Sequence, residues 1–215
     1  MRRDGVLVHS HAGFMKSLVL GANGRTGRQF IDQALAAGDH VTALVRSADR
    51  LSDLQHPRLE VRVGNPCDPE FLASVMSGHD VVVSALGPRV PTKFAAAIYS
   101  DSASAILHAM QQTGVTRLLV TSSALLFPDQ DLFGRVMKLA VPPIVNAAGR
   151  MEALIQDSNL EWTIARTGFL TDGQADTFQT SDRKGGTVSR AGVAHFLRSE
   201  AVNGQHIREV VGLSA

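Results

Sequence analysis

Short apolar runs alternate along this chain with segments whose apolar residues recur at helical spacing. The run Val81-Val82-Val83 has no polar alternate positions, which is typical of a strand covered on both faces, as in a parallel sheet. Strands are predicted at residues 17–20, 41–45, 59–63, 80–86, 116–121, 161–166 and near 206–211. Helices are predicted at 25–37, 68–77, 93–113, 146–158 and 191–199, with a short one near 48–54. This alternation predicts a single doubly wound α/β domain, with a parallel sheet and helices on both faces.

The first predicted strand leads into three glycines at G-x-x-G-x-x-G spacing, and a helical pattern follows. The segment is Leu18-Val19-Leu20-Gly21-Ala22-Asn23-Gly24-Arg25-Thr26-Gly27. Gly21 permits a tight turn, Gly24 lets the backbone approach a pyrophosphate, and Gly27 lets the helix pack closely. The amides of the first helical turn then face the anion. The pattern predicts a Rossmann-type dinucleotide site, and a purely structural turn is the alternative.

The second predicted strand ends in Val45-Arg46, where NAD-selective folds usually carry an acidic residue for the ribose 2′-hydroxyl. An arginine at this place can pair with a 2′-phosphate in a forked geometry. We therefore expect NADP(H) rather than NAD(H) as the cofactor. Arg25 in the glycine turn and Arg50 beyond the strand add positive charge nearby, although a solvated surface position is the alternative for each.

Small and hydroxylated residues follow the fourth and fifth predicted strands. Leu86-Gly87 follows the fourth, where a glycine leaves room for the cofactor; an ordinary turn is the alternative. Thr121-Ser122-Ser123 ends the fifth, beside the expected nicotinamide position. A hydroxyl there can bind a substrate carbonyl or the carboxamide. We predict Ser123 as the catalytic hydroxyl and Ser122 as a cofactor contact, with helix capping as the alternative for both.

Composition and charge indicate the cellular compartment and exclude some classes of binding partner. The 215 residues suffice for one well-buried domain, which we place at residues 15–215, after a disordered extension at 1–14. Basic and acidic residues balance, 21 against 20, which argues against nucleic acid or a membrane as the main partner. The single cysteine, Cys67, indicates a reducing, cytoplasmic compartment. We expect a monomer or weak homodimer and, because the histidines lack ligand spacing, no metal site.

These motifs, with Trp162-Thr163-Ile164-Ala165-Arg166-Thr167-Gly168, resemble those of the atypical short-chain dehydrogenase/reductase family over about residues 16–212. Within that family the chain is most similar to NAD(P)H-binding proteins related to flavin reductase (biliverdin reductase B) and to the NmrA-like regulators. The resemblance implies that NADP(H) is bound by Gly21, Asn23, Gly24, Arg25, Thr26, Gly27 and Arg46, with Leu86, Gly87 and Ser123 alongside.

The chain departs from that family at the proton donor. The usual Tyr-x-x-x-Lys pair is lacking, because the single tyrosine, Tyr99, is followed four residues later by Ala103. We interpret Tyr99 as a packing residue. Flavin reductase relatives carry a histidine after the sixth strand, where this chain has Thr167-Gly168-Phe169. Arg150 stands where NmrA-like proteins often place a lysine. Three roles are open for Arg150: an anchor for an anionic substrate, a partner of Glu152, or a position on a solvated helix face.

Two functions are consistent with these features. The first is an NADPH-dependent reductase that transfers hydride to a small-molecule acceptor such as a flavin or quinone, which takes its proton from water. Its pocket is expected to be built from Ser123, Phe127, Arg166 and residues 168–178, with the C-terminal segment closing it. The second is a non-catalytic NADP(H)-binding redox sensor of the NmrA-like type, which needs no proton donor. A nucleotide-sugar epimerase or dehydratase is disfavoured, because that class normally depends on the tyrosine-lysine pair.

Overall fold

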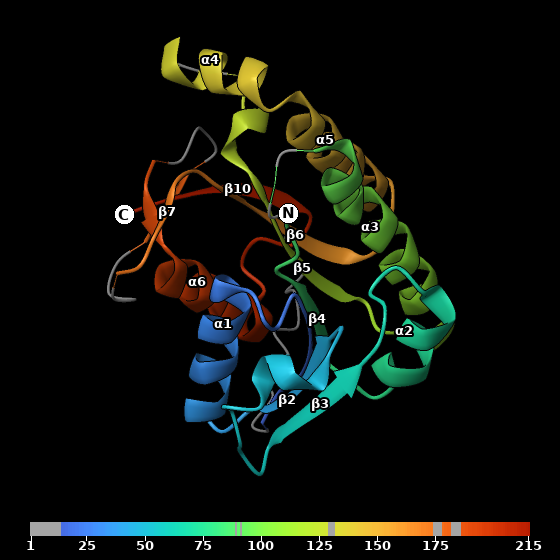
Figure 1. Ribbon diagram of the computed structural model, residues 1–215. Helices are drawn as coiled ribbons and strands as arrows, with labels where there is room; N and C mark the ends of the chain where they lie inside the picture. The colour runs from blue at the N-terminus through green and yellow to red at the C-terminus, as the bar shows by residue number, and fades with distance from the viewer. Residues whose placement is uncertain (1–13, 89, 91, 129–131, 174–177, 182–185) are drawn as a thin grey trace, which may run out of the picture.

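The computed structural model describes residues 14–88, 90, 92–128, 132–173, 178–181 and 186–215. Their centre is a sheet in the order β3-β2-β1-β4-β5-β6-β10-β8 (Figure 1). The strands are β1 Lys16–Leu20, β2 His40–Val45, β3 Leu59–Val63, β4 Val81–Ser84, β5 Arg117–Ser123, β6 Glu161–Thr167, β8 Gln179–Ser181 and β10 Glu209–Ser214. Neighbouring strands pair in parallel except β8, which is antiparallel to β10. The doubly wound α/β fold is thereby confirmed, with an antiparallel edge strand that the sequence analysis does not predict.

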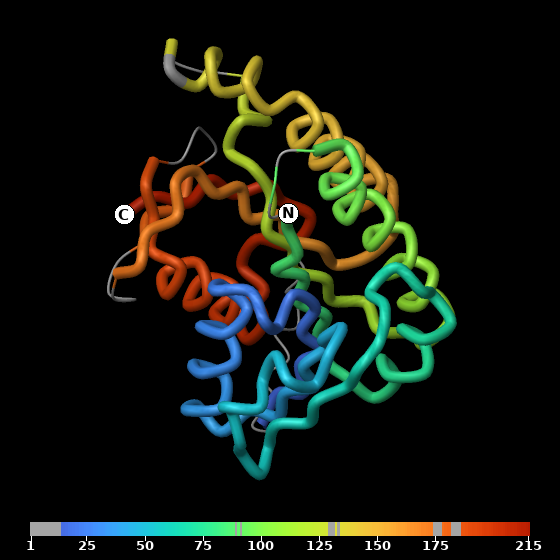
Figure 2. The backbone as a smooth tube through the Cα atoms, in the orientation of Figure 1, coloured from blue at the N-terminus to red at the C-terminus, as the bar shows by residue number. Residues whose placement is uncertain are grey.

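Helices cover both faces of the sheet. On one face lie α1 (Arg25–Ala36) and α6 (Arg190–Asn203), which come from opposite ends of the chain and run side by side (Figure 2). The other face is covered by α2 (Pro69–Met76), α3 (Lys93–Thr113) and α5 (Pro142–Gln156). The short 3-10 turns η1 (Ala48–Leu51) and η2 (Ala124–Leu126) follow β2 and β5. Within the described residues, no helix is long and apolar enough to cross a membrane.

The uniformly apolar run in β4 belongs to both layers of core. Val81 and Val83 pack in the cluster under α1 and α6, whereas Val82 packs in the cluster under α2, α3 and α5. Successive side chains of a strand point to opposite faces, so a strand buried on both faces carries no polar alternate positions. The interpretation of this run as a central parallel strand is confirmed.

The C-terminal third departs most from the predicted elements. The last strand runs over Glu209–Ser214, several residues later than expected, after a turn in which Arg208 has a φ of 60°. The polar stretch 171–186, in which no strand is predicted, contributes β8. In addition, β7 (Leu170–Thr171) pairs with β9 (Val188–Ser189) in a separate two-stranded sheet. These strands are two or three residues long, which is too short to show the alternation that identifies a strand.

Helix α4 (Leu132–Ala140) is absent from the predicted elements. Its apolar residues recur at helical spacing, yet Leu132, Val136 and Leu139 are 79%, 55% and 80% exposed. Figure 1 shows α4 at the edge of the molecule, beyond α5. The next helix, α5, begins at Pro142 rather than at the predicted 146, because proline is well tolerated in the first turn of a helix.

The predicted disordered extension lies mostly outside the described residues. Disorder of residues 1–13 therefore stays a prediction. Phe14 is described, and the guanidinium carbon of Arg58 lies 4.9 Å from the centre of its ring. A Cβ on Gly38 would come within 2.6 Å of the same ring. Phe14 thus contacts Arg58 and Gly38, and the domain start at residue 15 stays a prediction.

Candidate dinucleotide-binding site

The chain turns sharply at Gly21, between β1 and α1. Its φ of +77° lies in the left-handed region, and a Cβ there would lie 2.6 Å from the carbonyl oxygen of Ala85. A Cβ on Gly27 would lie 2.3 Å from the carbonyl oxygen of Gly21. Both contacts are with backbone atoms, so only glycine fits either position without a shift of the chain. The tight turn at Gly21 and the close packing at Gly27 are confirmed.

Helix α1 begins with its amides facing this turn. Gly24 is the N-cap, and its amide donates to the carbonyl oxygen of Gly21 at 2.8 Å. The amides of Arg25, Thr26 and Gly27 have no carbonyl acceptor within the helix, and the first turn holds no acidic residue. Such a helix start attracts an anion through its free donors and its dipole. A Cβ on Gly24 would lie 3.0 Å from the carbonyl oxygen of Gly21, so a larger residue would crowd the turn here as well.

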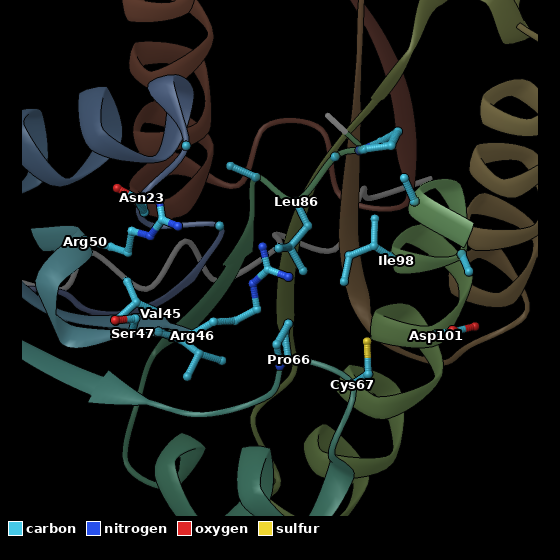
Figure 3. A pocket seen from close by; sticks show the side chains of 18 of the residues that line it. Asn23, Val45, Arg46, Ser47, Arg50, Pro66, Cys67, Leu86, Ile98 and Asp101 are labelled. Atoms are coloured by element: carbon cyan, nitrogen blue, oxygen red, sulfur yellow. The ribbon is translucent and has the colours of Figure 1, made fainter. Parts of the chain in front are cut away.

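A cleft of about 880 Å³ opens beside the turn, at the carboxyl ends of β1, β2 and β4 (Figure 3). It lies where the strand order reverses between β1 and β4, the position at which doubly wound folds bind their ligands. Six predicted cofactor residues line it: Gly21, Asn23, Gly24, Arg46, Leu86 and Gly87. The other four predicted ones, which are not part of its lining, are Arg25, Thr26, Gly27 and Ser122.

Two arginines extend into the cleft from the β2 side (Figure 3). Arg46 follows β2 directly, and Arg50 lies in η1. Both side chains are exposed and line the cleft, so their positive charges are available to a bound anion. The sequence analysis leaves a solvated surface position open for Arg50, and the structure places it on the wall of the cleft.

Arg28, which the sequence analysis does not single out, holds the β2 side of the cleft in place. Its guanidinium donates to Asp53 at 2.7 and 3.0 Å and to the carbonyl oxygen of Arg50 at 2.5 Å. A longer contact of 3.4 Å reaches Asn23 Oδ1. The hydrogen bond raises the pKa of Arg28 and lowers the pKa of Asp53. Nothing in the sequence pairs these two residues, because an arginine on a helix and a distant aspartate are ordinary surface residues.

The opposite wall of the cleft is mostly apolar. Pro66, Cys67 and Ile98 line it, with Asp101 at its rim. Burial is the main cause that raises the pKa of the Cys67 thiol, and the charge of Asp101 raises it further. Both effects favour the protonated thiol over the thiolate. An apolar wall of this kind suits an aromatic base.

Ser122 lies away from the cleft and serves a buried carboxylate. Its hydroxyl donates to Oε1 of Glu152 at 2.5 Å. Glu152, on α5, also accepts from Nε and Nη2 of Arg166 at 3.1 and 2.6 Å. The hydroxyl predicted to contact the cofactor is thus engaged with Glu152. Arg150, on the same helix, is exposed, and the arginine that pairs with Glu152 is Arg166.

Two further predicted residues have assigned local roles. The hydroxyl of Ser123 accepts a hydrogen bond from the amide of Leu125 at 3.2 Å and caps η2. This is the capping alternative, and a catalytic role for Ser123 stays a prediction. Tyr99 packs against the core under α3, as interpreted from the sequence. Burial, and then the charge of Glu152, raise the pKa of Tyr99 to about 12, which makes its hydroxyl a poor proton donor.

Arg25 joins the glycine turn to the C-terminal part of the chain. It forms an ion pair with Asp172, which also pairs with Arg190 at 2.7 Å. Asp172 lies in the segment 168–178 that is predicted to close the pocket, of which residues 174–177 lie outside the described part. Among all the residues that the structure describes, no group of three His, Cys, Asp or Glu residues is placed to hold a metal.

The chain is similar to known proteins over most of its length. Residues 21–203 match a family model described as NAD(P)H-binding. The photosystem II assembly factor Ycf39 of Synechocystis sp. is 25% identical over 158 residues, 73% of this chain and 45% of that protein. The chain thus spans about half the length of this relative.

Two solved structures show the same fold. The oxidoreductase ylbE from Lactococcus lactis has a TM-score of 0.82 at 17% identity and covers 93% of this chain and 90% of its own. ChuY, an anaerobillin reductase from Escherichia coli O157:H7, has a TM-score of 0.79 at 22% identity, and the match covers 93% of this chain and 97% of ChuY. Because the family model spans the chain from the glycine turn to the end of α6, the chain belongs to the NAD(P)H-binding family of atypical short-chain dehydrogenases/reductases.

Proposed function

We propose that this protein is an NADPH-dependent reductase that transfers hydride to a small acceptor such as a flavin or quinone. The observation that carries the proposal is the pair of guanidinium groups, Arg46 and Arg50, in one cleft with the glycine turn. A phosphate ester on the ribose 2′-position is the part of NADPH that NADH lacks. Forked guanidinium groups bind such a phosphate through charge-assisted hydrogen bonds.

The described residues fit a dinucleotide along the whole cleft. Cβ atoms at Gly21 and Gly27 would clash with the backbone of the turn. The first turn of α1 holds no acidic residue that would compete with a diphosphate for its amides. The adenosine half would lie between the arginines of the β2 side and the apolar wall of Pro66 and Ile98. The other half would lie towards the ends of β4 and β5. When bound, the cofactor supplies a hydride, and the protein orients the two reactants and excludes water.

The class of acceptor follows from the proton donors that this chain offers. The hydroxyl of Tyr99 is a poor acid, since burial and Glu152 raise its pKa to about 12. A flavin or quinone needs little help from a protein acid, because its reduced form takes a proton from water. ChuY is named as a reductase and has the same fold, which is consistent with this reading.

The second candidate function is a redox sensor that binds NADP(H) without turnover. The raised pKa of Tyr99 also favours this function, because it leaves Tyr99 a poor proton donor. A sensor needs the cleft and its arginines but no proton donor. The two functions differ only in whether an acceptor is reduced.

Calorimetric titration with NADPH and NADH tests the cofactor, and NADPH oxidation with FMN or a simple quinone tests the reaction. Arg46→Ala should weaken NADPH binding by about 10- to 100-fold and leave NADH binding nearly unchanged, because only NADPH has the 2′-phosphate. Arg62→Ala is the matched control, since Arg62 is an exposed arginine that pairs with Glu60 on β3. Equal losses for both coenzymes would refute the role of Arg46. If NADPH binds tightly but no acceptor oxidises it, the sensor function would be supported instead of the reductase.

A further inference from the structure

A buried ion pair lies at the carboxyl ends of β5 and β6, outside the lining of the cleft. The side chains of Glu152 and Arg166 are 4% and 15% exposed. Two hydrogen bonds of 3.1 and 2.6 Å join them, and the hydroxyl of Ser122 gives Glu152 a third donor. Ser122 and Arg166 are partners in the β5–β6 register, so their side chains leave the sheet on the same face. One carboxylate thus holds groups from two strands.

The position of this pair relates it to the cofactor cleft. In a doubly wound sheet a dinucleotide crosses the point where the strand order reverses, which here is between β1 and β4. Arg46 and Arg50 mark the adenosine half on the β2 side, so the reactive half lies over β4 and β5. The ends of β5 and β6 come next in the sheet. Arg166 therefore stands on the side where an acceptor would receive hydride.

The guanidinium of Arg166 is held in one orientation. Nε and Nη2 face Glu152, and the guanidinium carbon lies 4.6 Å from the centre of the Phe127 ring. Within the described residues, Nη1 has no hydrogen-bond partner. A buried ion pair adds little net stability, because the cost of desolvation offsets the attraction. Nη1 is thus a donor of fixed orientation that is available to a ligand.

We propose that Nη1 of Arg166 binds the acceptor oxygen on which negative charge develops during reduction, and that Glu152 and Ser122 position Arg166 for this. The inference rests on the proposed reductase function and narrows its acceptor to a quinone. The quinone takes up a hydride, one of its conjugated C=O π bonds breaks, and the electron pair of that bond settles on the oxygen. NADPH is oxidised to NADP⁺, and water supplies the proton that completes the product. The guanidinium stabilises the oxyanion and keeps its own protons.

Arg166→Lys is the first variant, because it keeps the charge beside Glu152 and loses the forked geometry. We expect quinone reduction at saturating NADPH to fall about 100-fold, the usual effect of removing one oxyanion donor, with NADPH affinity unchanged. The loss should be larger for quinones whose reduced forms are more basic, a trend that a purely structural role does not produce. Arg150→Gln is the control on the exposed face of α5. If Arg166→Lys does not fold, the double variant Glu152→Gln, Arg166→Gln replaces the ion pair by neutral amides.

A binding measurement tests the same group without turnover. Para-nitrophenolate has the charge of a reduced quinone, and its absorbance reports binding in the presence of NADP⁺. The wild-type protein should bind it at least about 10-fold more tightly than Arg166→Lys does, and Arg150→Gln should match the wild type.

The outcomes separate this inference from the proposed function. If the wild-type protein turns over and the rate of Arg166→Lys is within about two-fold of the wild-type rate, the inference is overturned and the proposed reductase function stands. A wild-type protein that binds NADPH but reduces no acceptor refutes the reductase. In that case phenolate binding still decides the oxyanion site: dependence on Arg166 supports it, and equal binding by wild type and variant overturns it.

Discussion

The guanidinium of Arg28 bonds both carboxylate oxygens of Asp53, at 2.7 and 3.0 Å. Arg28 belongs to the helix that follows the glycine turn, and Asp53 lies just beyond η1, the turn that carries Arg50. Arg28 also contacts Asn23 and the carbonyl oxygen of Arg50. The glycine turn and the arginine side of the cleft are therefore tied together at a fixed spacing.

Arg28→Gln should reduce the preference for NADPH over NADH. Without the fork to Asp53, η1 loses its anchor and Arg50 is no longer held at the cleft. We expect NADPH to bind about 10-fold more weakly and NADH to change much less, as measured by calorimetry. Asp53→Asn should give a loss in the same direction. An unchanged ratio of the two dissociation constants in both variants would contradict this positioning role.

Gly27→Ala should disrupt the turn itself. The new Cβ would lie 2.3 Å from the carbonyl oxygen of Gly21, so α1 must move away from β1. We expect a loss of about 1–3 kcal/mol in the free energy of unfolding, as for other overpacked sites, and a strong loss of NADPH affinity. Urea denaturation and calorimetry measure the two effects.

Gly149→Ala is the matched control for that substitution. Gly149 lies inside α5, and a Cβ there meets only the Leu126 side chain at an ordinary 3.6 Å. We expect this variant to be as stable as the wild type or more so, by up to about 1 kcal/mol, because alanine favours a helix. Equal effects of the two substitutions would show that the turn does not require its glycine.

The titration of Tyr99 can be read without interference, because it is the single tyrosine of the chain. Tyrosinate absorbance should appear near pH 12 in the folded protein and near about pH 10 in urea. Between these values the unfolded chain loses a proton that the folded chain keeps. The free energy of unfolding should therefore fall as the pH rises, by about 1.4 kcal/mol per unit from this group.

Two variants test whether Tyr99 causes this fall in the free energy of unfolding. Tyr99→Phe should abolish its share of the pH dependence. Glu152→Gln should lower the pKa of Tyr99, because the charge of Glu152 is the second cause that raises it. A folded protein whose tyrosine titrates as it does in urea would show that Tyr99 is solvated.

Ser123→Ala and Ser122→Ala should differ in their effect on stability. Ser123→Ala should slow NADPH oxidation without weakening cofactor binding, and an unchanged rate would remove Ser123 from the site. Ser122→Ala takes a hydroxyl donor from buried Glu152, so we expect a loss of about 1–3 kcal/mol in the free energy of unfolding. Urea denaturation distinguishes the two serines.

Local patterns were enough for the elements that carry the cofactor turn. The apolar run of β4, the helix over residues 93–113 and the three glycines were predicted at their observed places, because each is decided by neighbours in the sequence. The exposed apolar helix α4 escaped prediction, and the short polar strand β8 pairs only because the edge of β10 lies beside it.

By itself, the sequence determined the alternation of strands and helices and the glycine turn, since hydrophobic period and backbone freedom act over a few residues. Only the tertiary structure decided which side chains meet. Arg28 reaches Asp53 because α1 packs beside the turn after β2, and Arg166 reaches Glu152 and Ser122 because β5 and β6 pair in register beneath α5. Such meetings depend on how the crossovers bring distant segments together, and no local pattern encodes them.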